Sequence, residues 1–336
     1  MKLTAEQILS AAQGALRAWE EDGTIRLSRF TEEEAAMYAP TGFATKSRAS
    51  AGIQMEFDTD ADSLRLAVSM TLAGSRNFFA FEIYKDGERI GLLRNFEDED
   101  EQKEYISIKY PVGDFEGEYP LGTGMKRVRI VFPFTVCPMI RELSLANATV
   151  FTPVIREKKI LMYGDSITQG YDAILPSQTY AMRLGEMFGA QILNKGIGGE
   201  RFNPTLAAMH NDFKPDFITS AYGTNDWNTQ PKEMLTENCI GYHAELAKQY
   251  PDTPVFILAP IWRADTEAPR PFGTLDDLAG FLRGITEQYE NFHFIPGWDL
   301  VPHDPKYFGD KRLHPTAEGF AYFAKNLREE LKKFGI

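Results

Sequence analysis

The chain has 336 residues, of which 43% are hydrophobic and 25% are charged, as is usual for a globular protein with sizeable cores. Its length exceeds that of one average domain and favours two. Its 48 acidic and 36 basic residues leave a formal net charge of −12, which argues against nucleic acid or an anionic membrane as a partner. Two cysteines, Cys137 and Cys239, imply no disulfide framework and suit a reducing compartment.

The N-terminal residues lack the charged-then-apolar run of a signal peptide. No stretch approaches the roughly 18 uninterrupted apolar residues of a transmembrane helix. We therefore expect a cytoplasmic protein that does not associate with membranes. Residues 5–20 predict an amphipathic helix, because five apolar side chains fall near one face: Ile8, Leu9, Ala12, Leu16 and Trp19.

Residues 24–150 alternate apolar and polar side chains, which is typical of half-buried β-strands. Asp86-Gly87 between two such runs predicts a tight hairpin, because these residues accept positive φ angles. Helical periodicity is scarce here, so we expect residues 1–150 to form a jelly-roll-like β-sandwich after the N-terminal helix. The acidic stretch 97–101 is best interpreted as a solvated loop.

After Lys158, short apolar runs alternate with longer helical patterns. This alternation predicts a parallel sheet covered by helices, and thus an α/β domain over residues 158–336. The expected strands lie near 160–163, 192–193, 217–222, 255–259 and 292–295. The expected helices lie near 177–188, 232–250, 275–290 and 315–334.

Chemically useful residues follow the expected strands. The first strand ends in Gly164-Asp165-Ser166-Ile167-Thr168, the second in the segment 194–199, and the third in Gly223-Thr224-Asn225-Asp226. The last junction carries Asp310-Lys311-Arg312-Leu313-His314. Active sites of open α/β sheets gather at the carboxyl ends of the strands. A hydroxyl, a base and amide donors at this edge are the parts that acyl transfer needs.

These four blocks, in this order, resemble those of the SGNH (GDSL-like) hydrolase superfamily across the whole second half. The resemblance implies a flavodoxin-like catalytic domain in which Ser166 is the nucleophile and His314 the general base. It also implies an oxyanion hole made by the N–H groups of Ser166 and Gly199 and the side chain of Asn225. A β-sandwich before such a domain is similar to the architecture of the family-2 carbohydrate esterases, which remove acetyl groups from polysaccharides.

The last block departs from the family pattern, which places an aspartate three residues before the histidine. Lys311 occupies that position here, and Asp310 lies four residues before His314. A lysine cannot accept the Nδ1–H bond that orients the imidazole. Either the loop bulges by one residue and Asp310 takes this role, which we favour, or a backbone carbonyl orients His314.

Each block also has a purely structural interpretation. Ser166 and Asn225 could cap helices, and Gly196, Gly198 and Gly199 could be turn residues. All four blocks together favour the catalytic interpretation. The remaining histidines lack metal-ligand spacing, so we predict neither a metal nor a cofactor.

Trp227, Trp262 and Arg263 follow strand ends and are predicted to contact the substrate. Tryptophan rings suit sugar faces, although both rings could be packing residues. The preferred substrate is an ester of a small molecule or an oligosaccharide, such as an O-acetylated sugar, and its hydrolysis needs no cofactor. The alternatives are a lysophospholipase or short-chain lipase, and a carbohydrate-binding protein without activity. A homo-oligomer is compatible with the sequence.

Overall fold

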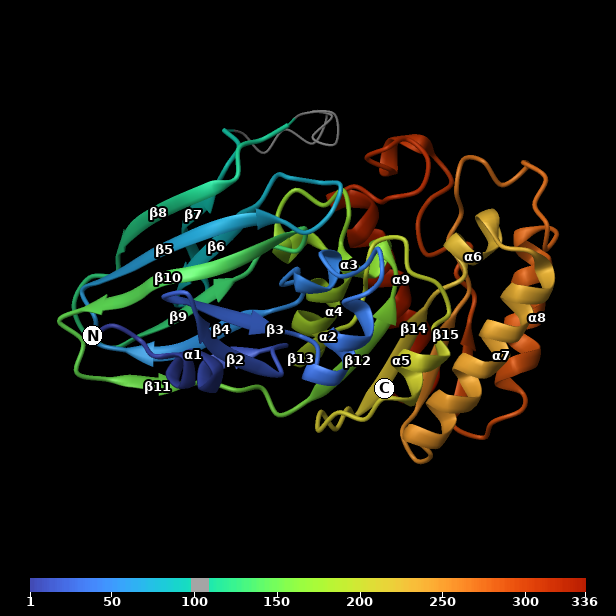
Figure 1. The fold of residues 1–336 in the computed structure, drawn as a ribbon, viewed down its shortest axis with the longest axis horizontal. Coiled ribbons are helices and arrows are strands. Elements are labelled where there is room, and N and C mark those ends of the chain that lie inside the picture. The colour runs from blue at the N-terminus through green and yellow to red at the C-terminus, as the bar shows by residue number, and fades with distance from the viewer. Residues whose placement is uncertain (98–108) are drawn as a thin grey trace. The chain divides into compact units, whose positions relative to one another are not determined.

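The computed structural model of the chain describes residues 1–97 and 109–336. It contains two compact units, the first made of residues 1–157, 174–178 and 191–194, and the second of the remaining described residues. The first is rich in antiparallel strands and the second is built on a parallel sheet. The predicted α/β class, with a β-rich region preceding the parallel sheet, is confirmed (Figure 1).

Two sheets make up most of the first unit. One has the order β1-β4-β9-β6-β7, with β11 also pairing with β4, and the other has the order β2-β3-β10-β5-β8. Their strands are β1 (Ala12–Gln13), β2 (Arg17–Glu21), β3 (Thr24–Ser28), β4 (Gln54–Thr59), β5 (Ser63–Leu72), β6 (Ala80–Lys85), β7 (Glu88–Arg94), β8 (Gly113–Pro120), β9 (Lys126–Val131), β10 (Val136–Ala146) and β11 (Phe151–Pro153).

Alternation along these strands builds the core of the first unit. Phe57, Leu66, Ile130 and Leu143 are fully buried members of one apolar cluster. The hairpin predicted at residues 86–87 is confirmed: both residues have positive φ angles, 50° and 87°, and Lys85 pairs with Glu88. A second hairpin, at residues 22–23, joins β2 to β3 in the same way.

Helices in this unit differ from the prediction. The N-terminal helix α1 (Ala5–Ala11) ends well before residue 20, so the long helix predicted there is wrong. Gly14 has a φ of 79°, and the chain then enters β2. The structure adds α2 (Glu32–Tyr38), which the reciprocal capping bonds of Thr31 and Glu34 begin. Two short 3₁₀ helices are η1 (Lys46–Arg48) and η3 (Pro176–Gln178). Of the predicted acidic loop, residues 98–101 lie outside the described residues.

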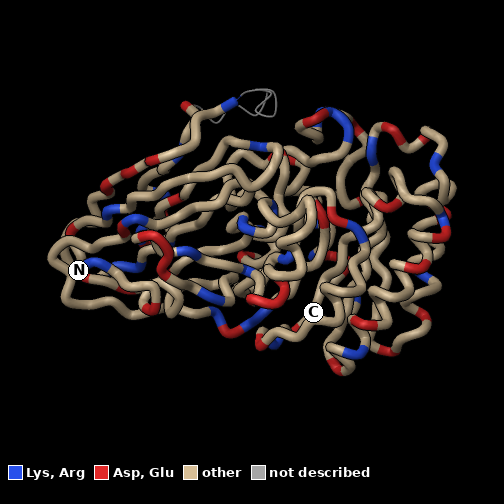
Figure 2. Tube along the Cα trace, in the orientation of Figure 1, with Lys and Arg blue, Asp and Glu red and all other residues tan. Residues whose placement is uncertain are grey.

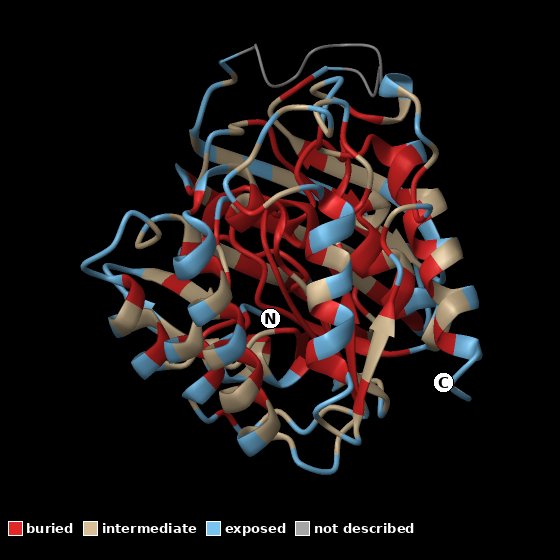
Figure 3. Ribbon diagram, turned by 90° about the vertical axis from the view of Figure 1, so that its right-hand side faces the viewer, coloured by how far each residue is buried: buried red, intermediate tan, exposed pale blue. Residues whose placement is uncertain are grey.

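The third sheet has the order β13-β12-β14-β15-β16, and its pairs from β12 to β16 are parallel. Strands β14 and β15 are almost wholly buried, as the continuous apolar runs predict for a sheet covered on both faces. Figure 3 shows buried residues in the interior and exposed residues along the outer helices. The strands are β12 (Lys159–Gly164), β13 (Gln191–Asn194), β14 (Phe217–Ala221), β15 (Val255–Leu258) and β16 (Phe292–Ile295).

The helices of the second unit connect these strands. Helix α4 packs against α9, and α5 against α7. The helices are α3 (Ser166–Gln169), α4 (Tyr180–Phe188), α5 (Pro204–Ala208), α6 (Thr224–Thr229), α7 (Lys232–Gln249), α8 (Leu275–Thr286), η4 (Pro305–Tyr307) and α9 (Ala317–Lys332). Among the described residues, no helix combines the length and apolar character needed to cross a bilayer. Acidic and basic residues are interspersed along the chain (Figure 2).

Candidate active site

The junction between β12 and α3 positions Ser166. Asp165 caps α3, because its Oδ1 accepts the N–H of Ile167 at 2.9 Å. Ser166 is therefore the first residue of the helix, at the carboxyl end of a parallel strand, and it is 4% exposed. The helix N-terminus directs unpaired N–H groups and a partial positive charge toward this position.

Three side chains form one hydrogen-bonded chain. Ser166 Oγ lies 2.8 Å from His314 Nε2, and Nδ1 of the same ring lies 2.7 Å from Asp310 Oδ2. His314 and Asp310 are both largely buried. The structure thus brings together three residues that are widely separated in the sequence.

One backbone feature accommodates the extra residue between Asp310 and His314. Lys311 adopts a φ of 59°, so the loop turns sharply within the interval. Asp310 Oδ1 accepts the backbone N–H groups of Arg312, Leu313 and His314 at 2.9, 2.7 and 3.1 Å. Burial alone raises the pKa of Asp310, but the bond to His314, its charge and these N–H groups together hold that pKa well below its usual range.

A second carboxylate approaches the same imidazole nitrogen. Asp172 Oδ2 lies 3.8 Å from His314 Nδ1, and its side chain is 2% exposed. Asp172 has a φ of 73°. At Gly309 any side chain would begin 2.7 Å from Asp172 Cβ, so this glycine permits the close approach. Sequence reasoning missed Asp172, because no motif marks it.

Two backbone N–H groups at the site lack acceptors within the described part of the chain: those of Ser166 and Gly199. Gly199 has a φ of 87° in the loop after β13. The third predicted donor, Asn225 on α6, is engaged through Nδ2 with the Glu200 carbonyl at 2.9 Å and with Asp165 Oδ2 at 3.3 Å. The longer bond is the weaker one and leaves this amide poised near the serine junction.

Two buried carboxyl groups lie beside these residues. Burial raises the pKa of Asp165 to about 6, against the opposing effects of the Ile167 N–H and the charge of His314. Burial also raises the pKa of Asp226 to about 7, although its Oδ1 accepts the N–H of Phe202. Carboxyl groups with raised pKa values are costly to bury in charged form and are typical of functional sites.

The structure does not support the substrate contacts predicted for Trp227 and Arg263. Trp227 is fully buried, and its indole N–H donates to the Gly273 carbonyl. Arg263 is 1% exposed and binds Asp265 and Thr224. The protein encloses both side chains, so neither presents a free surface to a ligand.

Trp262 is only half-buried and contacts the segment that precedes the loop of Asp310 and His314, called the triad loop below. Its ring stacks on His303, with centroids 5.7 Å apart, and packs against Phe308. The following segment is tied to the same loop, because the Ala264 N–H donates to the Arg312 carbonyl at 2.9 Å. Of the three predicted substrate contacts, Trp262 alone keeps an accessible position beside the site.

One cluster within residues 1–97 and 109–336 could supply three ligand atoms to a metal ion: Asp172, Asp310 and His314. Two of these residues are already joined by the short Asp310–His314 hydrogen bond. Asp310 Oδ2 lies against His314 Nδ1, the ring nitrogen that a metal would need as a ligand. The arrangement is that of a histidine between a hydroxyl and a carboxylate, which suits proton transfer.

Residues 162–322 match the GDSL-like Lipase/Acylhydrolase family. Residues 162–322 therefore form a GDSL-like lipase/acylhydrolase domain. The matched range contains Ser166, Gly199, Asn225, Asp310 and His314. A comparison with curated proteins found no match.

Several solved structures share the fold of nearly the whole chain. The salicylyl-acyltransferase SsfX3 from a tetracycline biosynthetic pathway has a TM-score of 0.79 and 21% identity, covering 97% of this chain and 94% of its own. A family two carbohydrate esterase from Cellvibrio japonicus has a TM-score of 0.67 and 16% identity, covering 99% and 97%. An acetyl xylan esterase from Butyrivibrio proteoclasticus has a TM-score of 0.62 and 14% identity, covering 100% and 98%.

Proposed function

We propose that this protein is a serine esterase that hydrolyses short-chain esters, acetyl esters above all, of O-acetylated sugars or oligosaccharides. The observation that carries the proposal is the hydrogen-bonded chain from Ser166 Oγ through His314 to Asp310, with distances of 2.8 and 2.7 Å. These are the distances expected of a nucleophile, its base and the group that orients the base.

Each residue has a defined task in this reaction. Asp310 accepts the Nδ1–H of His314 and so leaves Nε2 free to take the Ser166 proton. The serine oxygen attacks the ester carbonyl, and the imidazolium then protonates the departing alcohol. Water repeats the sequence on the acyl-enzyme and releases the acid. Asp172 adds a second negative charge near the imidazolium.

The oxyanion of each tetrahedral intermediate needs donors that are already oriented. The N–H groups of Ser166 and Gly199 are suited to this role, because both lack acceptors among the described residues. Asn225 supplies a third donor by exchanging its long bond to Asp165 for one to the substrate oxygen. Each such donor contributes roughly 3–4 kcal/mol to transition-state stabilisation.

The sugar part of the proposal is supported by the half-buried ring of Trp262 beside the triad loop and by the fold shared with carbohydrate esterases. A chain-length series of nitrophenyl esters tests the acyl part, and we expect kcat/KM to be highest for acetate. A steady rise to octanoate would favour a lysophospholipase or lipase. Mass spectrometry of acetylated oligosaccharides before and after incubation tests the sugar part.

The same acyl-enzyme can also pass its acyl group to an alcohol other than water. The fold shared with SsfX3, an acyltransferase, makes this second outcome worth measuring. Product analysis in the presence of a sugar alcohol separates the two: free acetate indicates hydrolysis, and a new ester indicates transfer. Absence of both ester cleavage and fluorophosphonate labelling would contradict the esterase proposal, and carbohydrate binding by such a protein would then favour the inactive binding protein.

A further inference from the structure

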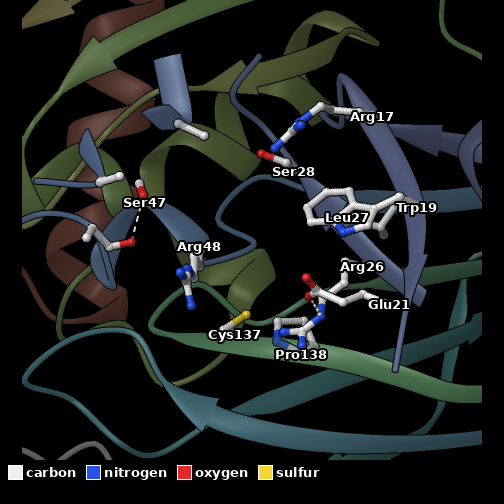
Figure 4. A pocket seen from close by; sticks show the side chains of 13 residues that line it. Arg17, Trp19, Glu21, Arg26, Leu27, Ser28, Ser47, Arg48, Cys137 and Pro138 are labelled. Atoms are coloured by element: carbon white, nitrogen blue, oxygen red, sulfur yellow. Dashed lines mark hydrogen bonds and ion pairs between the residues drawn. The ribbon is translucent and has the colours of Figure 1, made fainter. Parts of the chain in front are cut away.

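The first unit contains a cavity of about 290 Å³ that takes no part in the proposed reaction (Figure 4). Strand alternation explains one wall. Arg17, Trp19 and Glu21 lie on the same face of β2, and the register pairs Trp19 with Arg26 of β3. Cys137 and Pro138 of β10 complete the apolar part of this wall.

Small residues opposite this wall keep the cavity open. Ala35 of α2 and Ala39, the C-cap of that helix, lie one helical turn apart, and Ala44 follows in the next loop. A larger side chain at any of these positions would extend into the space. Ser47 and Arg48 of η1 line the same side, and Figure 4 shows Arg48 reaching toward Cys137.

The cavity is cationic in an otherwise acidic protein. Glu21 neutralises Arg26, because Arg26 Nε lies 3.0 Å from its carboxylate. Arg17 donates one hydrogen bond, from Nε to the Phe30 carbonyl. Its guanidinium lies 4.6 Å above the centre of the Trp19 ring. The guanidinium of Arg48 makes no hydrogen bond or ion pair with the described residues, whereas its backbone N–H donates to the Thr45 carbonyl. The guanidinium groups of Arg17 and Arg48 therefore line the cavity with N–H donors that are available to a ligand.

We propose that this cavity binds a small organic carboxylate with a flat apolar body. Arginine forks match carboxylates in two-point geometry, and Arg17 is held in place before any ligand arrives. Trp19, Leu27 and the alanines offer an apolar surface that a bare inorganic anion would not use. The volume is at the small end for ligand pockets and suits a single ring.

Calorimetry on the full chain tests this proposal with three probes: benzoate, its uncharged analogue benzyl alcohol, and inorganic phosphate. We expect benzoate to bind, and the other two to bind at least about tenfold more weakly, or 1.4 kcal/mol. Absence of benzoate binding at millimolar concentration, or equal binding of phosphate, would overturn the proposal.

Two variants locate the binding. Arg48→Gln should weaken benzoate binding at least about tenfold, and Ala35→Leu should abolish it by filling the cavity. Arg65→Gln is the matched control, because Arg65 is an exposed arginine of the same unit, paired with Glu116 away from the cavity. Benzoate could also occupy the esterase site as a product analogue, but Arg48→Gln would leave that binding unchanged. Unaltered affinity in Arg48→Gln therefore contradicts the proposal even if Ala35→Leu fails to fold.

Discussion

Buried polar side chains have different roles in the two units. In the first unit, Lys126 is 5% exposed, and its ammonium donates to the carbonyls of Ala61 and Gly122 at 2.7 and 2.6 Å. Arg29 is fully buried, and its Nε donates to the Ala49 carbonyl in the same manner. These side chains tie loops that would otherwise leave carbonyl groups unsatisfied.

In the second unit, buried polar groups gather at the carboxyl ends of the strands. Asp165 and Asp226 are carboxyl groups with raised pKa values, and Ser166 and His314 lie at the same edge. Such groups reduce stability when they ionise, in contrast to the loop ties of the first unit. The difference implies that substitutions in the two units should separate stability from activity.

Ser166→Ala tests this separation most strongly. The variant should lose roughly 10⁴-fold or more in esterase kcat, because the nucleophile is removed. Its melting temperature should stay close to that of the unaltered protein, since the hydroxyl supports no part of the core. A fluorophosphonate should label the unaltered protein at Ser166 and leave the variant unlabelled. Full labelling of the variant would exclude Ser166 as the nucleophile.

Asp310→Asn should lower kcat at least about a hundredfold with little change in KM, because the bond to His314 matters mostly in the transition state. Lys311→Ala is the control and should stay within a few-fold of the unaltered activity. Circular dichroism must show that both variants are folded. A loss below about tenfold in a folded Asp310→Asn protein would reduce the triad to a dyad.

Lys126→Met should have the opposite profile in the first unit. Removing the ammonium leaves two carbonyls without donors and should cost about 1–3 kcal/mol in the free energy of unfolding. Denaturant titration measures this loss, while kcat below the melting temperature should not change. A large fall in kcat without a fall in stability would contradict the comparison.

Asp226→Asn should change how stability depends on pH. The folded-state pKa is about 7 against an ordinary 3.8, so the folded protein retains a proton that the unfolded chain has lost. Stability from this group is present at low pH and is lost as pH rises through about 7. We expect the variant to gain several kcal/mol, at most about 4, over the unaltered protein between acidic and mildly alkaline pH. Denaturant unfolding at both pH values measures this gain. An equal difference in the free energy of unfolding between the two proteins at both pH values would contradict the prediction.

Asp172→Asn should produce the smallest effect. Asparagine keeps the shape and tolerates a positive φ, but it removes the second negative charge near His314. We expect kcat to fall by roughly three- to tenfold, or about 1 kcal/mol. An unchanged kcat in a folded variant would make Asp172 a packing residue only.

Sequence reasoning predicted the strands and main helices of the second unit well, because buried parallel strands and amphipathic helices have distinct periodicities. It failed at residues 12–20, where helical spacing of apolar residues coincided with a strand that Gly14 sets off from α1. Helix α2 was missed, although Thr31 and Glu34 have the spacing of a capping box.

For the site, strand-end position indicated Ser166 and His314, but it could not tell buried rings from exposed ones. Trp227 and Arg263 follow strand ends as Trp262 does, yet tertiary packing encloses only the first two. The position of Asp172 beside His314 depends on its own left-handed backbone conformation and on the lack of a side chain at Gly309. A single sequence reveals neither of these features.

Gly309 carries an evolutionary consequence. Because a Cβ there would lie 2.7 Å from Asp172 Cβ, these two positions cannot both carry side chains in this geometry. Relatives that keep an aspartate at the position of Asp172 should therefore keep glycine at that of Gly309. Relatives with a larger residue at the latter should have lost the second carboxylate. The pair should covary across homologous sequences even though neither residue belongs to the four blocks.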